Sequence, residues 1–122
     1  MRYLPKILFV DDEMDYLHLN TALLRKHGFD VYSLANGEEV FTTVNSFKPN
    51  LIVLDVRLGK HDGRVICQQL KADPRNRSIK VILDSAFPEV AKDYDQYGAE
   101  EFIQKPHTIE QLISRINHHL ER

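Results

Sequence analysis

Short apolar runs alternate with amphipathic stretches along the whole chain, and this alternation restricts the fold more than any other feature of the sequence. The apolar runs predict five strands, at residues 6–10, 30–34, 50–54, 79–83 and 101–104. Continuously apolar strands that are separated by helices are typical of a parallel sheet buried on both faces. The 122 residues suffice for one domain and are too few for two, so we expect a single domain over residues 1–122.

Each predicted strand is followed by a predicted helix. We expect the helices at Glu13–His27, Gly37–Phe47, Asp62–Lys71, Pro88–Gly98 and Ile109–Leu120, with a loop at residues 56–61. The last helix has the clearest apolar pattern and the fourth has the weakest. Right-handed crossovers leave few topologies for such units. The favoured one is a flavodoxin-like, doubly wound α/β fold with five helices and strand order 2-1-3-4-5.

Polar side chains follow four of the predicted strands. They are Asp11 with Asp12, then Asp55, Ser85 and Lys105. Parallel strands gather their carboxyl ends at one edge of the sheet, where α/β proteins bind ligands, so we expect these side chains to converge. Neighbouring carboxylates behind buried residues repel one another, and a divalent cation such as Mg²⁺, which prefers oxygen ligands, would offset that repulsion.

The same residue types suit the transfer of a phosphoryl group. A carboxylate such as Asp55 can act as a nucleophile toward phosphorus. The ammonium group of a lysine such as Lys105 stabilises phosphoryl oxygens as a compact positive charge. The set of residues therefore favours a site for a divalent metal and a phosphoryl group.

Each of these residues also has an ordinary explanation. The run Asp11–Glu13 suits the start of a helix, where acids cap backbone N–H groups and complement the helix dipole. A serine after a strand is usually a turn or cap residue, and a single lysine is usually a solvated charge. The combination at one edge of the sheet, rather than any single member, carries the functional interpretation.

The composition argues against several classes of function. A formal net charge of −2 disfavours non-specific binding of nucleic acid or of an anionic membrane, because both require clustered positive charge. No apolar run approaches the roughly 20 residues that span a bilayer, and residues 1–5 lack the apolar stretch of a signal peptide. Cys67 is the only cysteine, so we expect no internal disulfide, a cytoplasmic location and a buried thiol.

Five short motifs occur in an order that resembles a known family. They are Val10–Glu13, Leu54-Asp55, Asp62-Gly63, Ser85-Ala86 and the segment Gly98–Pro106 with its Gly-Ala, aromatic and Lys-Pro residues. Each motif is short and common, but together, at these spacings, they resemble the receiver domain of bacterial two-component response regulators. The resemblance extends over essentially the whole chain and agrees with the fold predicted from the strand and helix pattern.

The resemblance implies a role for each site residue. Asp55 would accept a phosphoryl group from a phosphohistidine of a sensor histidine kinase or phosphotransfer protein. Asp12, Asp55 and the backbone carbonyl of Arg57 would ligate Mg²⁺ or Mn²⁺, and Asp11 would hold a metal-bound water. Lys105 would contact a phosphoryl oxygen, and Ser85 would hydrogen-bond the attached phosphate.

The resemblance also implies a switch in place of an enzymatic turnover. Phe102 would be the switch aromatic, and the fourth helix, fifth strand and fifth helix would form the output face. The domain would signal to an output domain or partner protein and would bind neither nucleic acid nor membrane itself. The sequence leaves open which output this is, and whether phosphorylation also drives dimerisation.

Several residues depart from the usual pattern of the family. Gly59 stands where Pro is common, and Phe102 stands where Tyr is frequent. Asp84 precedes Ser85 where an apolar residue is usual, and the sequence leaves open whether it lies near the site or in solvent. Arg57 and Phe87 occupy positions that tune water access in the family, and the large Phe87 predicts slow loss of the phosphoryl group.

Three other functions are compatible with the fold class. A haloacid-dehalogenase-type phosphohydrolase also uses Mg²⁺ and an Asp nucleophile, but it usually needs a second Asp two residues later, where this chain has Arg57. A flavodoxin-type cofactor binder needs a phosphate loop after the first strand, where this chain has acids. A degenerate receiver that acts only as an interaction module is the third alternative.

Overall fold

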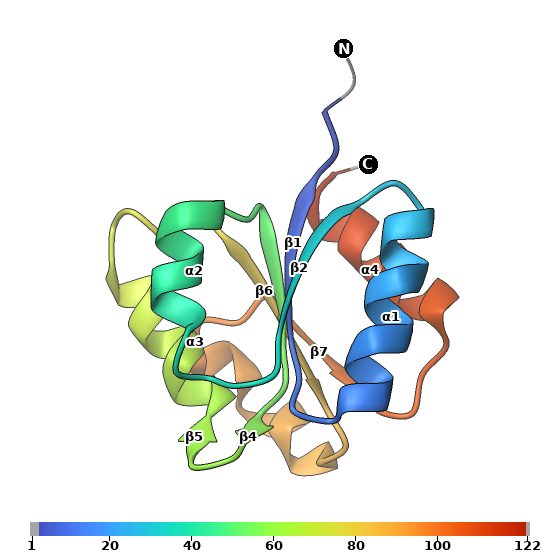
Figure 1. Ribbon diagram of the computed structural model, residues 1–122. Helices are drawn as coiled ribbons and strands as arrows, with labels where there is room; N and C mark the ends of the chain where they lie inside the picture. Colours follow the sequence, from blue (N-terminus) through green and yellow to red (C-terminus); the bar gives the residue numbers. More distant parts are fainter. Residues whose placement is uncertain (1–2, 122) are drawn as a thin grey trace.

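The predicted parallel sheet is present in a computed structural model, which describes residues 3–121; residues 1, 2 and 122 of the predicted domain lie outside the described part. Five parallel strands form the sheet in the order β2-β1-β3-β6-β7 (Figure 1). They span Lys6–Val10 (β1), Asp30–Leu34 (β2), Leu51–Leu54 (β3), Lys80–Ser85 (β6) and Glu101–Gln104 (β7). This is the predicted flavodoxin-like order, with β6 and β7 as its fourth and fifth strands.

Helices cover both faces of the sheet. Helices α1 and α4 lie on one face, and α2 and α3 on the other (Figure 1). Their bounds are Met14–Lys26 (α1), Val40–Phe47 (α2), Gly63–Ala72 (α3) and Ile109–His119 (α4). None of the helices within residues 3–121 is long and apolar enough to cross a membrane.

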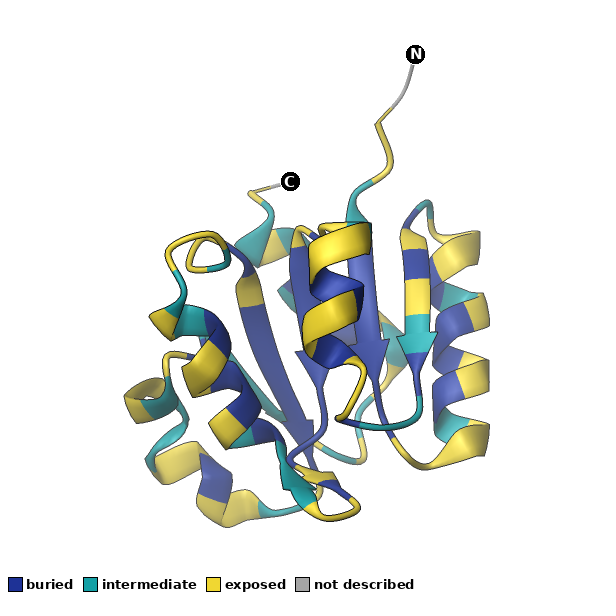
Figure 2. Cartoon of the chain, turned by 60° about the vertical axis from the view of Figure 1, so that its left-hand side comes forward, coloured by how far each residue is buried: buried dark blue, intermediate teal, exposed yellow. Residues whose placement is uncertain are grey.

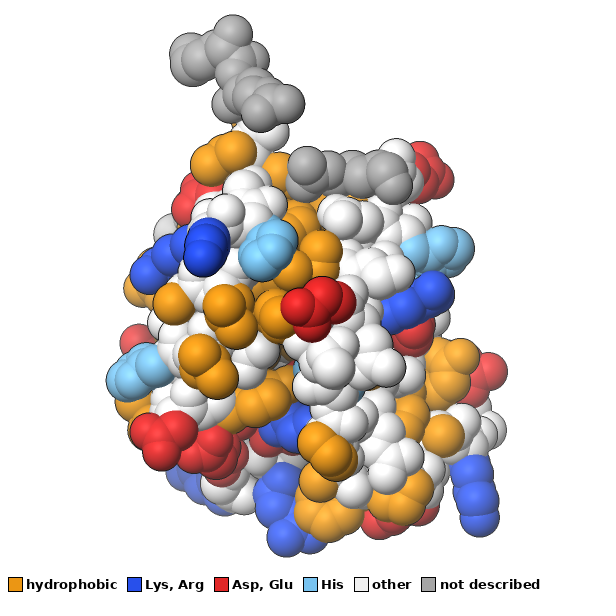
Figure 3. Space-filling model, turned by 90° about the vertical axis from the view of Figure 1, so that its right-hand side faces the viewer, with side chains coloured by type: hydrophobic (Ala, Val, Ile, Leu, Met, Phe, Trp, Pro, Cys, Tyr) orange, Lys and Arg blue, Asp and Glu red, His pale blue; other side chains and the backbone are white. Residues whose placement is uncertain are grey.

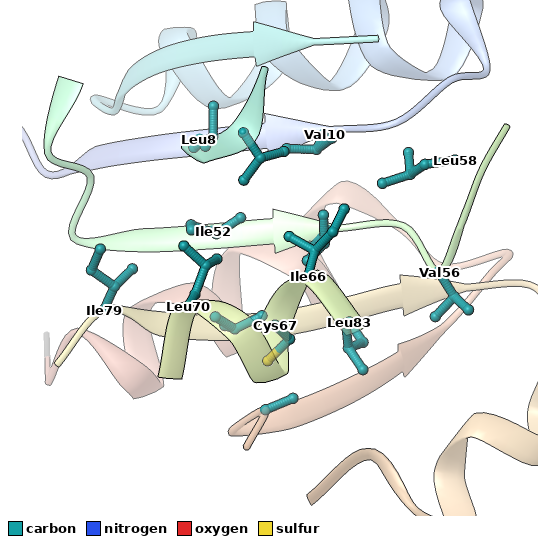
Figure 4. Packing of buried hydrophobic residues seen from close by; sticks show 14 of the residues in the cluster. Leu8, Val10, Ile52, Val56, Leu58, Ile66, Cys67, Leu70, Ile79 and Leu83 are labelled. Atoms are coloured by element: carbon teal, nitrogen blue, oxygen red, sulfur yellow. The ribbon is translucent and has the colours of Figure 1, made fainter. Parts of the chain in front are cut away.

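Alternate side chains of the central strands feed two hydrophobic cores, because successive residues of a strand point to opposite faces. Leu8, Ile52 and Leu83 pack with α2 and α3, together with Cys67, whose thiol is buried as predicted (Figure 4). Their neighbours in sequence pack with α1 and α4. The central strands are therefore buried after their first residues, Lys6 and Lys80, while the outer helix surfaces are exposed (Figure 2). This burial explains the continuous apolar runs.

The predicted fourth helix, Pro88–Gly98, is wrong. Two short 3₁₀ helices stand in its place, at Pro88–Lys92 and Tyr94–Tyr97, and they are separated at Asp93, whose φ of −139° is not helical. Only Val90 of this segment is buried. Val90 and the half-buried Tyr94 together give too little burial to hold a longer α-helix against the sheet, so four α-helices are present among the described residues instead of five.

Several local features also differ from the prediction. The expected loop at residues 56–61 contains a two-stranded antiparallel hairpin, Arg57–Leu58 (β4) and His61–Asp62 (β5). Helix α2 begins at Val40, three residues late, because Glu38 and Glu39 form a turn that the Asn36 side chain closes by accepting from the Glu39 N–H. Strand β6 continues through Ser85.

Candidate functional site

The acidic residues converge at the carboxyl ends of β1 and β3, which are neighbours in the sheet. Val10 pairs with Leu54, so the residues that follow them meet, and the Asp55 N–H donates to the Val10 carbonyl at 3.0 Å. One carboxylate oxygen from each of Asp11, Asp12 and Asp55 lies within 4.8 Å of the others. Asp11 and Asp55 are buried and Asp12 is exposed. The sheet thus brings these sequence-predicted acids together, with Asp12 as the member that is open to solvent.

Hydrogen bonds fix the orientation of the two buried carboxylates. Asp11 accepts from the Glu13 N–H at 2.9 Å through Oδ1 and from the Lys105 ammonium at 2.6 Å through Oδ2. Asp55 accepts from the Val56 N–H at 2.8 Å through Oδ1, while its Oδ2 lies 3.5 Å from the Lys105 Nζ. Both oxygens of Asp11 are therefore engaged, whereas Oδ2 of Asp55 is the less constrained oxygen.

Lys105 directly follows β7, and its side chain extends to the acids that follow β1 and β3. The backbone N–H of Lys105 donates to the Ser85 carbonyl at 2.9 Å, which extends the pairing of β7 with β6. The peptide bond between Lys105 and Pro106 is cis. The ammonium group lies between Asp11 and Asp55 and above the ring of Tyr16, 4.4 Å from its centroid. The predicted lysine is therefore part of the same cluster as the acids.

The charges of the cluster shift one another's pKa values. Burial raises the pKa of Asp55 to about 6, although the Lys105 charge acts in the opposite direction. Burial also raises the pKa of Asp11, against the hydrogen bond from Lys105. Burial alone would lower the pKa of Lys105, but the hydrogen bond to Asp11 and the charge of Asp55 raise it. Within residues 3–121, Lys105 is the only cation within ion-pair distance of these two buried acids, so the site favours binding a further positive charge.

Ser85 ends β6, the strand that pairs with β3, and its carbonyl accepts from the Lys105 backbone N–H. Ser85 is fully buried, and its Oγ accepts from the Phe87 N–H at 3.1 Å, so the hydroxyl retains its own proton to donate. The guanidinium of Arg57 stacks on the Phe87 ring at 4.3 Å from the centroid. Phe102 is half-buried against the core on the α2 and α3 side.

Four residues near the site were missed or left unassigned by the sequence analysis. Asp84 is buried and accepts from Tyr16, and it pairs with His107. Gly63 packs so closely on the backbone at Asp55 and Val56 that a Cβ there would lie 2.0 Å from the Asp55 carbonyl oxygen. The only signals in the sequence are positional: Asp84 adjoins Ser85, His107 follows the Lys-Pro pair, and Asp62-Gly63 is one of the motifs.

Comparison with known proteins places the chain among signalling domains. The family model described as response regulator receiver domain matches residues 7–117. The probable transcriptional regulator ycf27 of Cyanophora paradoxa is 35% identical over 119 residues, which cover 96% of this chain and 48% of the relative. The DNA-binding dual master transcriptional regulator RpaA of Synechocystis sp. is 30% identical over 121 residues, covering 98% of this chain and 50% of RpaA. The chain therefore spans about half the length of these curated relatives.

Solved structures agree on the fold. The BeF3-activated N-terminal receiver domain of Klebsiella pneumoniae RstA superimposes with a TM-score of 0.86 at 27% identity, covering 96% of this chain and 99% of that one. The CheY-like receiver domain protein of Methanospirillum hungatei JF-1 superimposes with a TM-score of 0.90 at 23% identity, covering 98% and 95% of the two chains. Given the match across residues 7–117 and an acidic cluster at the expected sheet edge, this chain belongs to the receiver domain family of two-component response regulators.

Proposed function

We propose that Asp55 is the phosphoacceptor of this receiver domain and that the phosphoryl donor is a phosphohistidine on a sensor histidine kinase or phosphotransfer protein. The observation that carries the proposal is the position of Asp55 Oδ2, which lies 3.5 Å from the Lys105 Nζ and within 4.8 Å of the other two acids. We further propose that residues 1–122 form one such domain and that it acts as a signalling switch rather than an enzyme with turnover.

The donor set fits a hard divalent cation, because three carboxylates can offer oxygen atoms to one point. We propose Mg²⁺ or Mn²⁺, with Asp12, Asp55 and the backbone carbonyl of Arg57 as ligands. Both oxygens of Asp11 already accept hydrogen bonds from the protein, which supports a role for Asp11 in holding a metal-bound water. When bound, the cation would neutralise carboxylate charge and polarise the phosphoryl oxygens.

Asp55, Lys105 and Ser85 would each have a separate role in the phosphoryl transfer. Oδ2 of Asp55 forms a bond to phosphorus while the P–N bond of the phosphohistidine breaks, and the electron pair leaves with the imidazole nitrogen, which takes up a proton. Lys105 balances the charge of the transferred oxygens. The Ser85 hydroxyl donates a hydrogen bond to the attached phosphate, which has up to three acceptor oxygens.

The partner surfaces follow from the position of the site. Met14 and Leu19 of α1 are exposed on the face that α1 and α4 form, where other apolar side chains also reach the surface (Figure 3). This face supports docking of the phosphodonor protein beside Asp55. For output we propose the 3₁₀ segment at residues 88–97 with β7 and α4, with Phe102 as the switch aromatic.

The output itself is part of the proposal. Because the curated relatives are about twice as long and RpaA is described as DNA-binding, we propose that signalling passes to a further domain or to a partner protein. The receiver domain binds no nucleic acid itself in this proposal. A cytoplasmic location stays a prediction, and the buried free thiol of Cys67 is consistent with a reducing compartment.

Incubation with acetyl phosphate tests the proposed function. With Mg²⁺ present, the intact protein should gain one phosphoryl group. With EDTA the rate should fall by about 100-fold, because the metal supplies charge stabilisation worth several kcal/mol. Intact-protein mass spectrometry measures both. If the folded protein gains no phosphoryl group in Mg²⁺, the protein is better described as a degenerate receiver that acts as an interaction module. If the rate of phosphoryl uptake is the same with and without EDTA, the proposed metal site is excluded.

Phe87 should control how long the phosphoryl group survives. Its ring, covered by the Arg57 guanidinium, would restrict the approach of water to the acyl phosphate. We expect Phe87→Ala to accelerate loss of the phosphoryl group roughly threefold to tenfold by admitting water, measured from the decay of the adduct mass after the donor is removed. Phe41→Ala, which truncates an exposed ring on α2, is the matched control. Equal decay in the Phe87 variant and the wild type would refute this role.

A further inference from the structure

Three polar side chains from separate parts of the chain meet beside Lys105. Tyr16 comes from α1, Asp84 from β6 and His107 from the loop between β7 and α4. The Tyr16 hydroxyl donates to Asp84 Oδ2 at 2.5 Å, and the His107 Nε2 lies 2.8 Å from Asp84 Oδ1 and 2.9 Å from the Tyr16 oxygen. The side chains of Asp84 and His107 are only 1% and 4% exposed. The three groups thus form a closed hydrogen-bonded triad away from water.

The surroundings of His107 indicate that it carries a proton on both ring nitrogens. Its Nδ1 lies 3.1 Å from the Thr108 carbonyl oxygen, which can only accept. Its Nε2 faces the Asp84 carboxylate, which also accepts. An imidazolium satisfies both contacts, and it balances the charge of a buried carboxylate that would otherwise be costly. Burial alone would lower the pKa of His107, but Asp84 raises it above its ordinary value.

Tyr16 is held in place by this ion pair. Burial, with the charge of Asp84, raises the pKa of the Tyr16 phenol above its usual range, so the phenol stays protonated and donates to Asp84. The contacts with Asp84 and His107 hold the hydroxyl end of Tyr16 in place, and the rings of Phe9 and His107 pack beside the Tyr16 ring, with centroids at 5.9 Å and 6.1 Å. The position of the Tyr16 ring is therefore set in part by residues of β6 and of the loop before α4.

The face of that ring lies against the functional ammonium group. The Lys105 Nζ is 4.4 Å from the Tyr16 ring centroid, 2.6 Å from Asp11 Oδ2 and 3.5 Å from Asp55 Oδ2. A cation within about 6 Å of an aromatic face is attracted by the ring quadrupole. Lysine is otherwise a flexible point charge on a four-carbon stem. The ring restricts the ammonium group to the side from which a phosphoryl group on Asp55 would be reached.

We propose that Tyr16 is a positioning residue for Lys105 in phosphoryl transfer, and that Asp84 and His107 act by fixing Tyr16. The proposal rests on the proposed function, because the transferred group must arrive at Asp55. It assigns a purpose to Asp84, which the sequence left open, and it links the lysine to α1, β6 and the loop before α4 through contacts that do not touch the phosphoryl group.

The test is the rate at which acetyl phosphate modifies the protein in Mg²⁺, followed by intact mass. Tyr16→Leu removes the ring and should slow the reaction about tenfold, while Tyr16→Phe keeps the ring but releases it from Asp84 and should slow it about threefold. Tyr32→Leu, a change to a half-exposed tyrosine on the edge strand β2, is the matched control and should leave the rate unchanged.

A double-mutant cycle with Lys105→Met separates positioning from general damage. If Tyr16 acts through Lys105, Tyr16→Leu should cause little further slowing in the Lys105→Met background. A merely structural role would slow both backgrounds equally. Should Tyr16→Leu fail to fold, Tyr16→Phe and His107→Gln, which preserve most of the buried volume, carry the same cycle.

The outcomes distinguish the two proposals. A wild-type protein that gains no phosphoryl group would remove the proposed function, and the role of Tyr16 with it. A wild-type protein that is modified normally, together with unchanged rates in the Tyr16 variants or equal slowing in both lysine backgrounds, would overturn the positioning role alone.

Discussion

Replacing Asp55 with Asn should abolish phosphoryl uptake and, in metal-free solution at neutral pH, should stabilise the fold by about 2 to 3 kcal/mol. Uptake is lost because the amide has no anionic oxygen to attack phosphorus. The fold gains stability because the Asp55 carboxylate is held among other acids, where burial raises its pKa to about 6 from an ordinary 3.8. Burial thus makes the ionised Asp55 carboxylate costly in the folded protein, and a bound cation would offset that cost.

The pH dependence of this gain has a definite sign. Below about pH 4 the Asp55 carboxyl is protonated in both the folded and the unfolded chain, so its ionisation costs nothing. Between pH 4 and pH 6 the folded protein keeps the proton while the unfolded chain loses it, so folding becomes less favourable as the pH rises. Above pH 6 the full cost is present. Wild type and Asp55→Asn should therefore be about equally stable near pH 4 and differ most at pH 7.

Urea unfolding in EDTA, followed by circular dichroism at several pH values, measures the difference. The control is Asp73→Asn, because Asp73 forms an ion pair with Arg75 that lowers its pKa, so its loss should not stabilise the protein at pH 7. Added Mg²⁺ should stabilise the wild type and reduce the advantage of the Asn variant. A variant no more stable than the wild type at pH 7, or one that still gains a phosphoryl group, would contradict the assignment of Asp55.

Gly63→Ala should cost at least about 3 kcal/mol of folding free energy. The added Cβ would lie 2.0 Å from the carbonyl oxygen of Asp55 and 3.1 Å from the Cα of Val56. Both neighbours are backbone atoms, which cannot swing aside as a flexible side chain would. Relief requires α3 to move away from the end of β3, which would also break the bond from the Gly63 N–H to the Val56 carbonyl at 2.7 Å.

The same substitution at Gly28 provides the comparison. Gly28 has a φ of +91° but open space around its Cβ position, so alanine there should cost only about 1 to 2 kcal/mol of backbone strain. In thermal and urea unfolding, Gly63→Ala should lose more free energy of unfolding than Gly28→Ala, by more than the backbone strain alone accounts for. In whatever fraction of Gly63→Ala folds, phosphorylation should also slow, because the loop that follows Asp55 is displaced. Near-wild-type stability of Gly63→Ala would show that α3 is not packed this tightly.

The architecture of the site follows from the sequence because the features that set it are local. Each apolar run that ends in a polar residue specifies a buried parallel strand with that residue at its carboxyl end. Connectivity then places Asp11 and Asp12 beside Asp55, and it brings Lys105 to the same edge. The weak pattern after Pro88 was wrongly predicted to form one helix, because nothing in the pattern specifies that the chain breaks at Asp93 into two short 3₁₀ helices.

The environment of Asp84 was decided only by the tertiary structure. In β6, Ile82 packs on the α1 and α4 side and Leu83 on the α2 and α3 side, so the alternation of the strand turns Asp84 toward α1 and α4. A carboxylate can be buried there only if other elements supply hydrogen-bond partners for it. These partners are Tyr16, which is 68 residues away in the sequence, and His107, which is 23 residues away. The sequence alone determined the sheet, its order and the acids at its edge, because strand burial and chain connectivity act locally and in sequence order. The tertiary structure alone decided which buried polar groups become partners, because a hydrogen bond requires a donor and an acceptor to meet in space, and no periodicity along the chain records that meeting.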